Sequence, residues 1–209
     1  MNYRHLHQQL ARLRAMISIS LFAILSACSS TPVAQRQQYD FGPWLAETPA
    51  TPLPGRLQFS LTEIAVPAAL ESNAMLYRLQ YDNVQQLKAY SQHRWSMPPA
   101  QLLAQRLKTR MANQGSDVML STEAASPFPV LRIELEEFSQ IFSSPNQSHA
   151  QISLRASLVK GRQLLAQKSF QQKVNAASAD APGGAKAMQE AADASIDALQ
   201  TWIKSLPLN

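Results

Sequence analysis

Alternating apolar and polar residues in the second half of the chain constrain the fold most strongly. The alternation runs through residues 130–142 and 150–159, and residues 163–174 are expected to return as a further strand after a tight turn. The residues between these runs, 143–146 and 160–162, are typical of turns. A period of two places the apolar side chains on one face of a β-strand. This half of the chain therefore predicts three consecutive antiparallel strands with one buried face.

Three more strands are predicted earlier in the chain. Residues 56–62 alternate between apolar and polar side chains, which predicts a half-buried strand. Residues 75–81 and 87–95 are expected to form a second and a third strand, joined as a hairpin at the turn over residues 82–83.

Two amphipathic helices complete the predicted fold. The first spans 98–115, begins with two prolines and has an apolar face, and its basic residues Arg106, Lys108 and Arg110 are expected to point away from that face. The second spans 185–206 after a loop at 175–184, and it is expected to dock on the core because its polar face is not basic. The order βββ-α-βββ-α predicts one α+β domain with a mainly antiparallel sheet and helices packed on one face.

The first 28 residues carry a signal of a different kind. Residues 1–14 contain three arginines and no acid, and a short apolar run follows at 15–25, as in a secretory signal peptide. The run is too short to span a bilayer. It ends in four residues that resemble the bacterial lipobox: Leu25, Ser26, Ala27 and Cys28. The lipobox predicts a signal peptide over 1–27 and acylation of Cys28, which anchors the chain in a membrane; the alternative is a cysteine that ends an ordinary signal peptide by chance.

The residues after Cys28 predict a tether and a destination. No aspartate follows the cysteine directly, so we expect the outer membrane of a Gram-negative bacterium, with the chain facing the periplasm. Residues 28–55 are rich in Ser, Pro and Gln and predict an extended tether before a compact domain over 56–206. An aromatic segment at 39–44 within the tether is expected to pack against the domain.

Composition excludes several classes of function. The formal net charge is +5, but three of the 19 basic residues and none of the 14 acidic residues precede Cys28, so no nucleic-acid partner is expected. One cysteine excludes an internal disulfide and a cysteine-based zinc site. No nucleophile–base pair is evident around His93 or His149. The acidic residues of one predicted strand, Glu134, Glu136 and Glu137, are too few for a hard-cation site, so we expect neither metal, cofactor nor enzymatic activity.

An aromatic and basic segment in the predicted hairpin provides the candidate protein-interaction residues. Tyrosine, arginine and tryptophan are enriched at interface hot spots. The candidates are Tyr77, Arg78, Tyr81, Tyr90, Arg94 and Trp95. Ordinary core packing of an aromatic hairpin is the equally weighted alternative.

Several short stretches behind the lipobox resemble, in this order, the ABC-type transport auxiliary lipoprotein component family. They are Met75 to Tyr81, Tyr90, Arg94-Trp95, Pro98 to Leu103, Ser148 to Val159, Leu164 to Phe170 and, more loosely, Ala191 to Ala194. The resemblance implies a non-enzymatic lipoprotein that works with an MCE-type (mammalian cell entry) substrate-binding protein and its ABC permease and ATPase. Such systems move lipids or other hydrophobic molecules between the two membranes, and a homo-oligomeric ring is plausible. The alternative function is an envelope assembly or stability lipoprotein, for example a chaperone for outer-membrane proteins or lipopolysaccharide.

Overall fold

The computed structural model describes residues 36–43, 58–113, 117–120 and 128–207 of the chain. These residues belong to one unit that begins at Arg36. The predicted signal peptide, the lipobox with Cys28 and most of the predicted tether lie outside the described residues.

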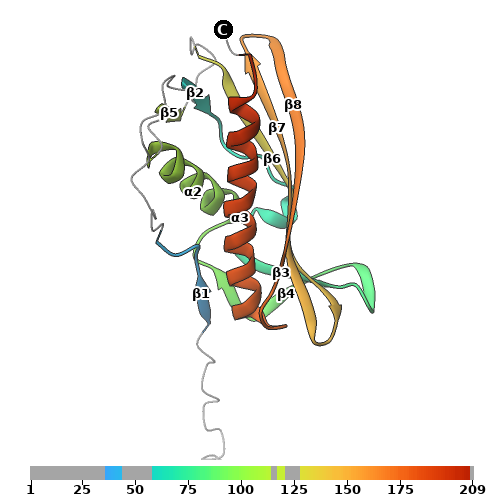
Figure 1. Cartoon of the computed structure of the whole chain (residues 1–209). Coiled ribbons are helices and arrows are strands. Elements are labelled where there is room, and N and C mark those ends of the chain that lie inside the picture. Colours follow the sequence, from blue (N-terminus) through green and yellow to red (C-terminus); the bar gives the residue numbers. More distant parts are fainter. Residues whose placement is uncertain (1–35, 44–57, 114–116, 121–127, 208–209) are drawn as a thin grey trace, which may run out of the picture. The chain divides into compact units, whose positions relative to one another are not determined.

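Three long antiparallel strands form the largest part of the sheet, as the sequence predicts. They are β6 (Val130–Ser144), β7 (Gln147–Lys160) and β8 (Gln163–Asn175) (Figure 1). Leu135 pairs with Leu154, which in turn pairs with Phe170, so apolar residues of all three strands meet on the same face. All three side chains are buried, and burial alternates along β7 as the period of two requires.

The opposite edge of β6 is occupied by two shorter strands that both run parallel to it. They are β2 (Gln58–Leu61) and β3 (Ala74–Leu79), and a short 3-10 helix, η1 (Ala68–Leu70), lies between them. β3 forms the predicted hairpin with β4 (Asn83–Trp95). Because β2 and β3 follow each other along one edge of β6, the sheet divides there into two branches.

Each branch ends in a short strand that the sequence pattern did not predict. β5 (Asp117–Leu120) pairs with β2, and β1 (Gln37–Tyr39) pairs with β4, both in parallel. The eight described strands therefore form one mixed, open sheet. The α+β fold is confirmed, and the longest ladders are antiparallel, but four pairings are parallel.

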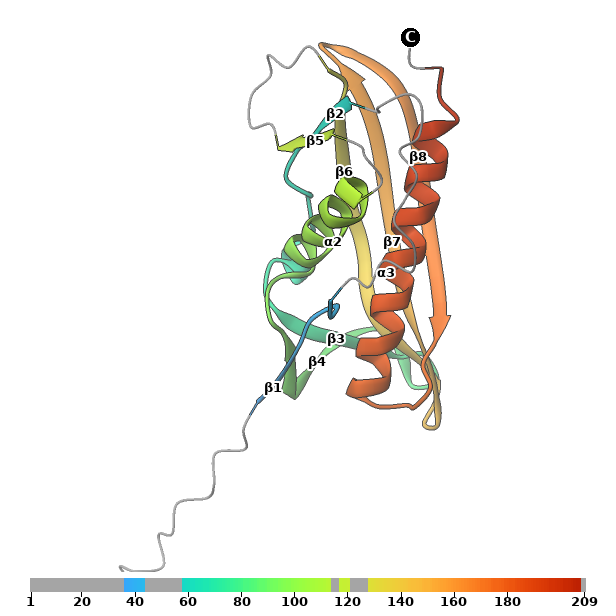
Figure 2. The ribbon, with the colours of Figure 1, turned by 60° about the vertical axis from the view of Figure 1, so that its left-hand side comes forward.

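Two helices cover one face of the sheet, as predicted (Figures 1 and 2). They are α2 (Pro99–Asn113) and α3 (Ala181–Lys204). The predicted apolar stripe of α3 is buried at Met188, Ala192, Ile196, Leu199 and Ile203. The final helix is therefore a docked core helix.

The start of α3 differs from the prediction by four residues, because two glycines in a predicted loop belong to its first turn. The Asp180 carboxylate accepts a hydrogen bond from the Gly183 backbone N–H at 2.8 Å and caps the helix. Gly184 lies against buried Gln140, and a Cβ at position 184 would lie 2.0 Å from the Gln140 side-chain oxygen. The close approach of helix and sheet explains a glycine at a position where helix propensity disfavours it.

Residues 39–43 of the N-terminal aromatic segment pack on the domain, as expected, and Trp44 lies outside the described residues. β1 extends the sheet, and the Tyr39 carbonyl accepts a hydrogen bond from the Ser96 N–H at 2.7 Å. The Phe41 ring, 5% exposed, contacts Trp95 at 6.0 Å and Phe138 at 6.3 Å between ring centroids. The folded domain therefore begins at β1, earlier than the predicted boundary at residue 56.

Candidate functional site

An aromatic cluster forms where β1, β3, β4 and β6 meet. The Tyr77 ring lies 4.6 Å from the Tyr90 ring and 5.8 Å from Phe142. The His93 ring continues the cluster, 5.7 Å from Tyr90 and 5.8 Å from Tyr39, and the Tyr39 hydroxyl is 3.2 Å from His93 Nδ1. Alternate residues of neighbouring strands share a face, which brings these rings together although they are distant in sequence.

A buried glutamine connects this aromatic cluster to the start of α3. The Tyr90 hydroxyl donates to Gln140 Oε1 at 2.9 Å. Gln140 Nε2 donates to Ser148 Oγ at 2.8 Å and to the Asp180 carbonyl at 3.0 Å. The amide therefore bridges β4, β6, β7 and the N-terminal end of α3.

Two groups at this junction have shifted pKa values. Burial raises the pKa of the Tyr90 hydroxyl above its usual value of 10.0, and the nearby Tyr77 and Asp180 add to the effect. Hydrogen bonds from the Ser178 hydroxyl and the Gly183 N–H lower the pKa of Asp180, and His93 contributes in the same direction. Tyr90 is a neutral donor and Asp180 a charged cap at neutral pH.

The predicted interaction residues are divided among different environments. Tyr77 and Tyr90 are half-buried in the aromatic cluster, and Arg78 is half-buried against Glu137 at 3.2 Å. Arg94 is half-buried near the end of β4, and Tyr81 is 49% exposed at the tip of the β3–β4 hairpin.

Trp95 requires a correction. Its side chain is 1% exposed and packs edge-on against Phe138 at 5.5 Å. A side chain enclosed in this way cannot reach a partner without unfolding the domain. The core-packing alternative is the correct interpretation for this residue.

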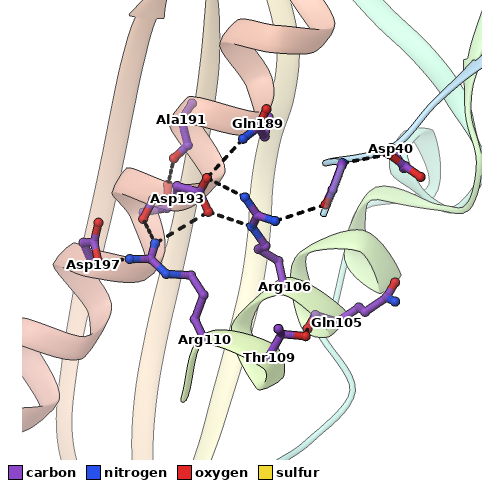
Figure 3. Close-up of polar contacts among 11 residues, drawn as sticks. Asp40, Gln105, Arg106, Thr109, Arg110, Gln189, Ala191, Asp193 and Asp197 are labelled. Atoms are coloured by element: carbon purple, nitrogen blue, oxygen red, sulfur yellow. Dashed lines mark hydrogen bonds and ion pairs between the residues drawn. The ribbon is translucent and has the colours of Figure 1, made fainter. Parts of the chain in front are cut away.

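Two arginines join α2 to α3, and the prediction that they point away from the core-facing side of α2 is wrong. Arg106 and Arg110 are each only 6% exposed. Arg106 binds the Asp193 carboxylate through two hydrogen bonds of 2.8 Å, and Arg110 donates to the Asp193 carbonyl at 2.7 Å (Figure 3). Arg110 also forms an ion pair with Asp197.

The spacing of these four residues contained a signal that would have predicted the contact. The arginines are four residues apart on α2, and the aspartates are four residues apart on α3. Residues four apart lie on the same side of a helix, so each helix presents two charges that complement those of the other. This match allows both arginines to be buried with charged partners.

A cavity of about 280 Å³ lies beside this ion-pair cluster. It is lined by Asp40, Phe41, Gly42, Pro43, Met97, Leu102, Gln105, Arg106 and Thr109. Arg106 Nη1 donates to the Gly42 carbonyl at 3.2 Å across its wall (Figure 3). The N-terminal segment is thus held both by β4 and by α2.

Comparison with known proteins identifies the family of this fold. The ABC-type transport auxiliary lipoprotein component family matches residues 39–199. The chain belongs to this family.

Two crystal structures share the fold of this auxiliary lipoprotein. Protein XCC0632 from Xanthomonas campestris, of the DUF330 family, is 19% identical with a TM-score of 0.68, and the alignment covers 80% of this chain and 94% of that chain. An uncharacterized protein is 14% identical with a TM-score of 0.59, covering 81% and 99% of the two chains. Comparison with curated proteins finds no match.

The remaining charged and titratable residues singled out by the sequence lie on β6 and β7. Arg155 lies 3.7 Å from the Glu134 carboxylate and 2.7 Å from that of Glu136. Within these residues no three acidic, histidine or cysteine side chains gather in a way that could hold a metal ion. The pKa of His149 is lowered, mainly by burial and by Lys173.

No helix in the described part of the chain is both long and apolar enough to cross a bilayer.

Proposed function

We propose that this auxiliary lipoprotein is a non-enzymatic component of an ABC/MCE-type transport system. It is anchored in the outer membrane, faces the periplasm and assists the transfer of lipids or other hydrophobic molecules between the two membranes. The observation that carries the proposal is the family match over residues 39–199, behind a leader that ends in the lipobox. Acylation of Cys28 would supply the anchor, since two or more acyl chains hold a protein stably on a membrane.

The proposed partners are an MCE-type substrate-binding protein and the permease and ATPase of the same system, with the lipoprotein itself arranged as a ring. The aromatic cluster supports an interaction role, because aromatic and arginine side chains dominate interface energetics. Tyr77, Tyr90, Arg78 and Arg94 are the proposed contact residues. Their half-buried side chains expose an edge to a partner while the rest of each side chain packs on the domain.

Crosslinking in intact cells followed by purification of the lipoprotein tests the partnership. We expect to recover the MCE-type protein, and recovery should fall for Arg94→Ala because that change removes a charged contact while leaving the buried core intact. Trp95→Ala is the matched structural control. It should lower the melting temperature because Trp95 is buried, which separates a loss of stability from the loss of a contact. Failure to recover any MCE-type protein with the unaltered chain would contradict the proposal.

The anchor has its own test. Cys28→Ser should leave the domain folded but release it from the membrane fraction or block processing of the leader. Membrane fractionation with an outer-membrane marker measures this directly. Unchanged fractionation of the Cys28→Ser protein with the outer membrane would refute the lipobox interpretation.

A further inference from the structure

Four large apolar side chains are substantially exposed in the described residues, and they form two separate pairs. Tyr81 and Val84 are 49% and 50% exposed at the tip of the β3–β4 hairpin. Leu164 and Leu165 are 54% and 38% exposed at the start of β8. The two pairs lie at opposite ends of the sheet, because β3 pairs with the C-terminal part of β6 whereas β8 begins opposite its N-terminal part.

The point at which the chain enters the domain distinguishes these two ends. Gln37, the first residue of β1, pairs with His93 beside the aromatic cluster. Both views place this N-terminal end of β1 and the β3–β4 hairpin toward the same end of the sheet, and the β7–β8 turn toward the other (Figures 1 and 2). β1 begins at the open end of the β3–β4 hairpin, where Ala74 pairs with Arg94, so the chain enters the domain in the same half of the sheet as Tyr81 and Val84.

The length of chain before β1 limits how far the domain can stand from an anchor at Cys28. Eight residues lie between Cys28 and Gln37, so the chain makes nine Cα–Cα steps from one to the other. A fully extended chain spans at most about 3.3–3.6 Å per residue, so the reach is about 30 Å. β4 bulges twice against β3, so the paired part of the hairpin is only as long as β3 from Ala74 to Leu79, about 17 Å. The distance from the base of the hairpin, where β1 pairs, to its tip is therefore shorter than the reach of about 30 Å between Cys28 and Gln37.

The chemistry of the hairpin tip suits a lipid surface. All seven residues from 80 to 86 are exposed, and Asp82 is the single charged residue among them. The Asp82 carboxylate lies 3.9 Å from the Lys88 ammonium group, so the tip presents no net charge to lipid headgroups. Tyrosine is favoured at membrane–water interfaces because its ring is apolar and its hydroxyl is polar.

We propose that the tip of the β3–β4 hairpin, with Tyr81 and Val84, rests on the lipid surface to which Cys28 anchors the chain. The inference rests on the lipid anchor of the proposed function and extends it by giving the domain a defined orientation. Leu164 and Leu165 then point away from the membrane. Tyr81, which the sequence predicts as a protein-interaction residue, is thereby assigned to contact with lipid.

Fluorescent labelling of the full lipidated protein tests this orientation. Cys28 is the only cysteine of the chain and its thiol is consumed by acylation, so Gln85→Cys gives one free thiol next to Val84. The matched control is Gln163→Cys, which places the same label next to Leu164 at the other end of the sheet. Each protein is labelled with an environment-sensitive dye and reconstituted into phosphatidylethanolamine–phosphatidylglycerol vesicles with and without nitroxide-labelled lipid.

The expected result is a blue shift and nitroxide quenching at position 85, with neither at position 163. Adding Tyr81→Ser and Val84→Ser to the Gln85→Cys protein should abolish both effects, because the apolar pair is what enters the interface. Vesicle flotation of each sample distinguishes failure of the lipid anchor from failure of the hairpin contact. Protein that fails to float refutes the anchor, and the orientation with it.

Protein that floats with an unquenched label at position 85 refutes the hairpin contact alone. Equal quenching at positions 85 and 163 also overturns the inference, because the domain would then have no preferred orientation. A blue shift at position 85 without quenching would assign the tip to a second copy of the chain.

Discussion

Replacing Arg106 by alanine should destabilise the domain far more than replacing an exposed arginine that has two acidic partners. Arg106 is 6% exposed, binds both Asp193 carboxylate oxygens at 2.8 Å and donates to the Gly42 carbonyl at 3.2 Å. Removing one member of a buried ion pair typically costs about 3–5 kcal/mol, because the remaining charge loses its partner. Asp193 is 19% exposed and retains Arg110 at 3.6 Å, so we expect the lower end, about 3 kcal/mol.

Arg155→Ala is the matched control for this prediction. Arg155 faces two carboxylates, but its side chain is 43% exposed and those of Glu134 and Glu136 are 56% and 43% exposed. Exposed pairs contribute about 0–1 kcal/mol. Urea unfolding followed by circular dichroism should therefore separate the two variants, and the melting temperature of Arg106→Ala should fall by about 6–12 °C.

A double-mutant cycle locates the origin of the effect. Arg106→Ala combined with Asp193→Ala should be less destabilising than the sum of the two single changes, with a coupling free energy of about 0.5–3 kcal/mol. Comparable losses of stability for Arg106→Ala and Arg155→Ala would refute the reasoning. So would an Arg106→Ala effect below about 1 kcal/mol, since that is the range of an exposed pair.

Three further predictions concern the aromatic end of the domain and its titratable groups. Gly184→Ala should lower the free energy of unfolding by about 1–3 kcal/mol, because its methyl group would collide with Gln140; a gain in stability, as expected for an unhindered helical glycine, would contradict the close contact. The raised pKa of Tyr90 means that its folded-state stabilisation is complete below pH 10 and is lost as pH rises above that value. Tyr90→Phe should therefore reduce the loss of stability at alkaline pH. At neutral pH it should lower the free energy of unfolding by about 1–3 kcal/mol, because Gln140 Oε1 loses its hydrogen-bond donor. Denaturant unfolding measured across pH checks both effects. The lowered pKa of His149 means that its contribution is present above pH 6.5 and is lost as pH falls below it, so His149→Gln should flatten the acid limb of the same profile.

The central strands could be predicted because their signal is local. The period of two in β6 and β7 depends only on which face of the sheet is buried, and short turns set the pairing of consecutive strands, β8 included. The hairpin of β3 and β4 and the apolar stripe of α3 follow from the same kind of local pattern. The confirmed α+β fold rests on these elements.

The parallel pairings could not be predicted from such patterns. β2 and β3 reach the same edge of β6 through connections that are not short hairpins, and alternation does not state which edge a distant strand will join. β1 and β5 have only three and four residues, too few for a periodic signal. β1 pairs with β4 and β5 pairs with β2, so the formation of each depends on a strand that is distant in the sequence.

The misassigned residues at the candidate site share one physical cause, which is that burial of polar groups depends on partners elsewhere in the chain. The sequence places Arg106 and Arg110 away from the apolar face, because charges on a helix usually face water. They are buried because Asp193 and Asp197 neutralise them. The sequence likewise places Gly184 in a loop, and only the presence of Gln140 explains a glycine inside the helix.

The N-terminal segment shows how these buried contacts affect the proposed orientation. Residues 37–42 are fixed by three independent contacts: backbone pairing of β1 with β4, packing of Phe41 against Trp95, and the hydrogen bond from Arg106 to the Gly42 carbonyl. A segment fixed by one contact could swing about it, whereas three contacts in different directions determine where the chain enters the domain. The Arg106–Asp193 pair therefore also helps to set the orientation proposed for the hairpin tip. Arg106→Ala should therefore weaken nitroxide quenching at position 85 even at temperatures where the domain remains folded, because the entry point of the tether is then held less firmly.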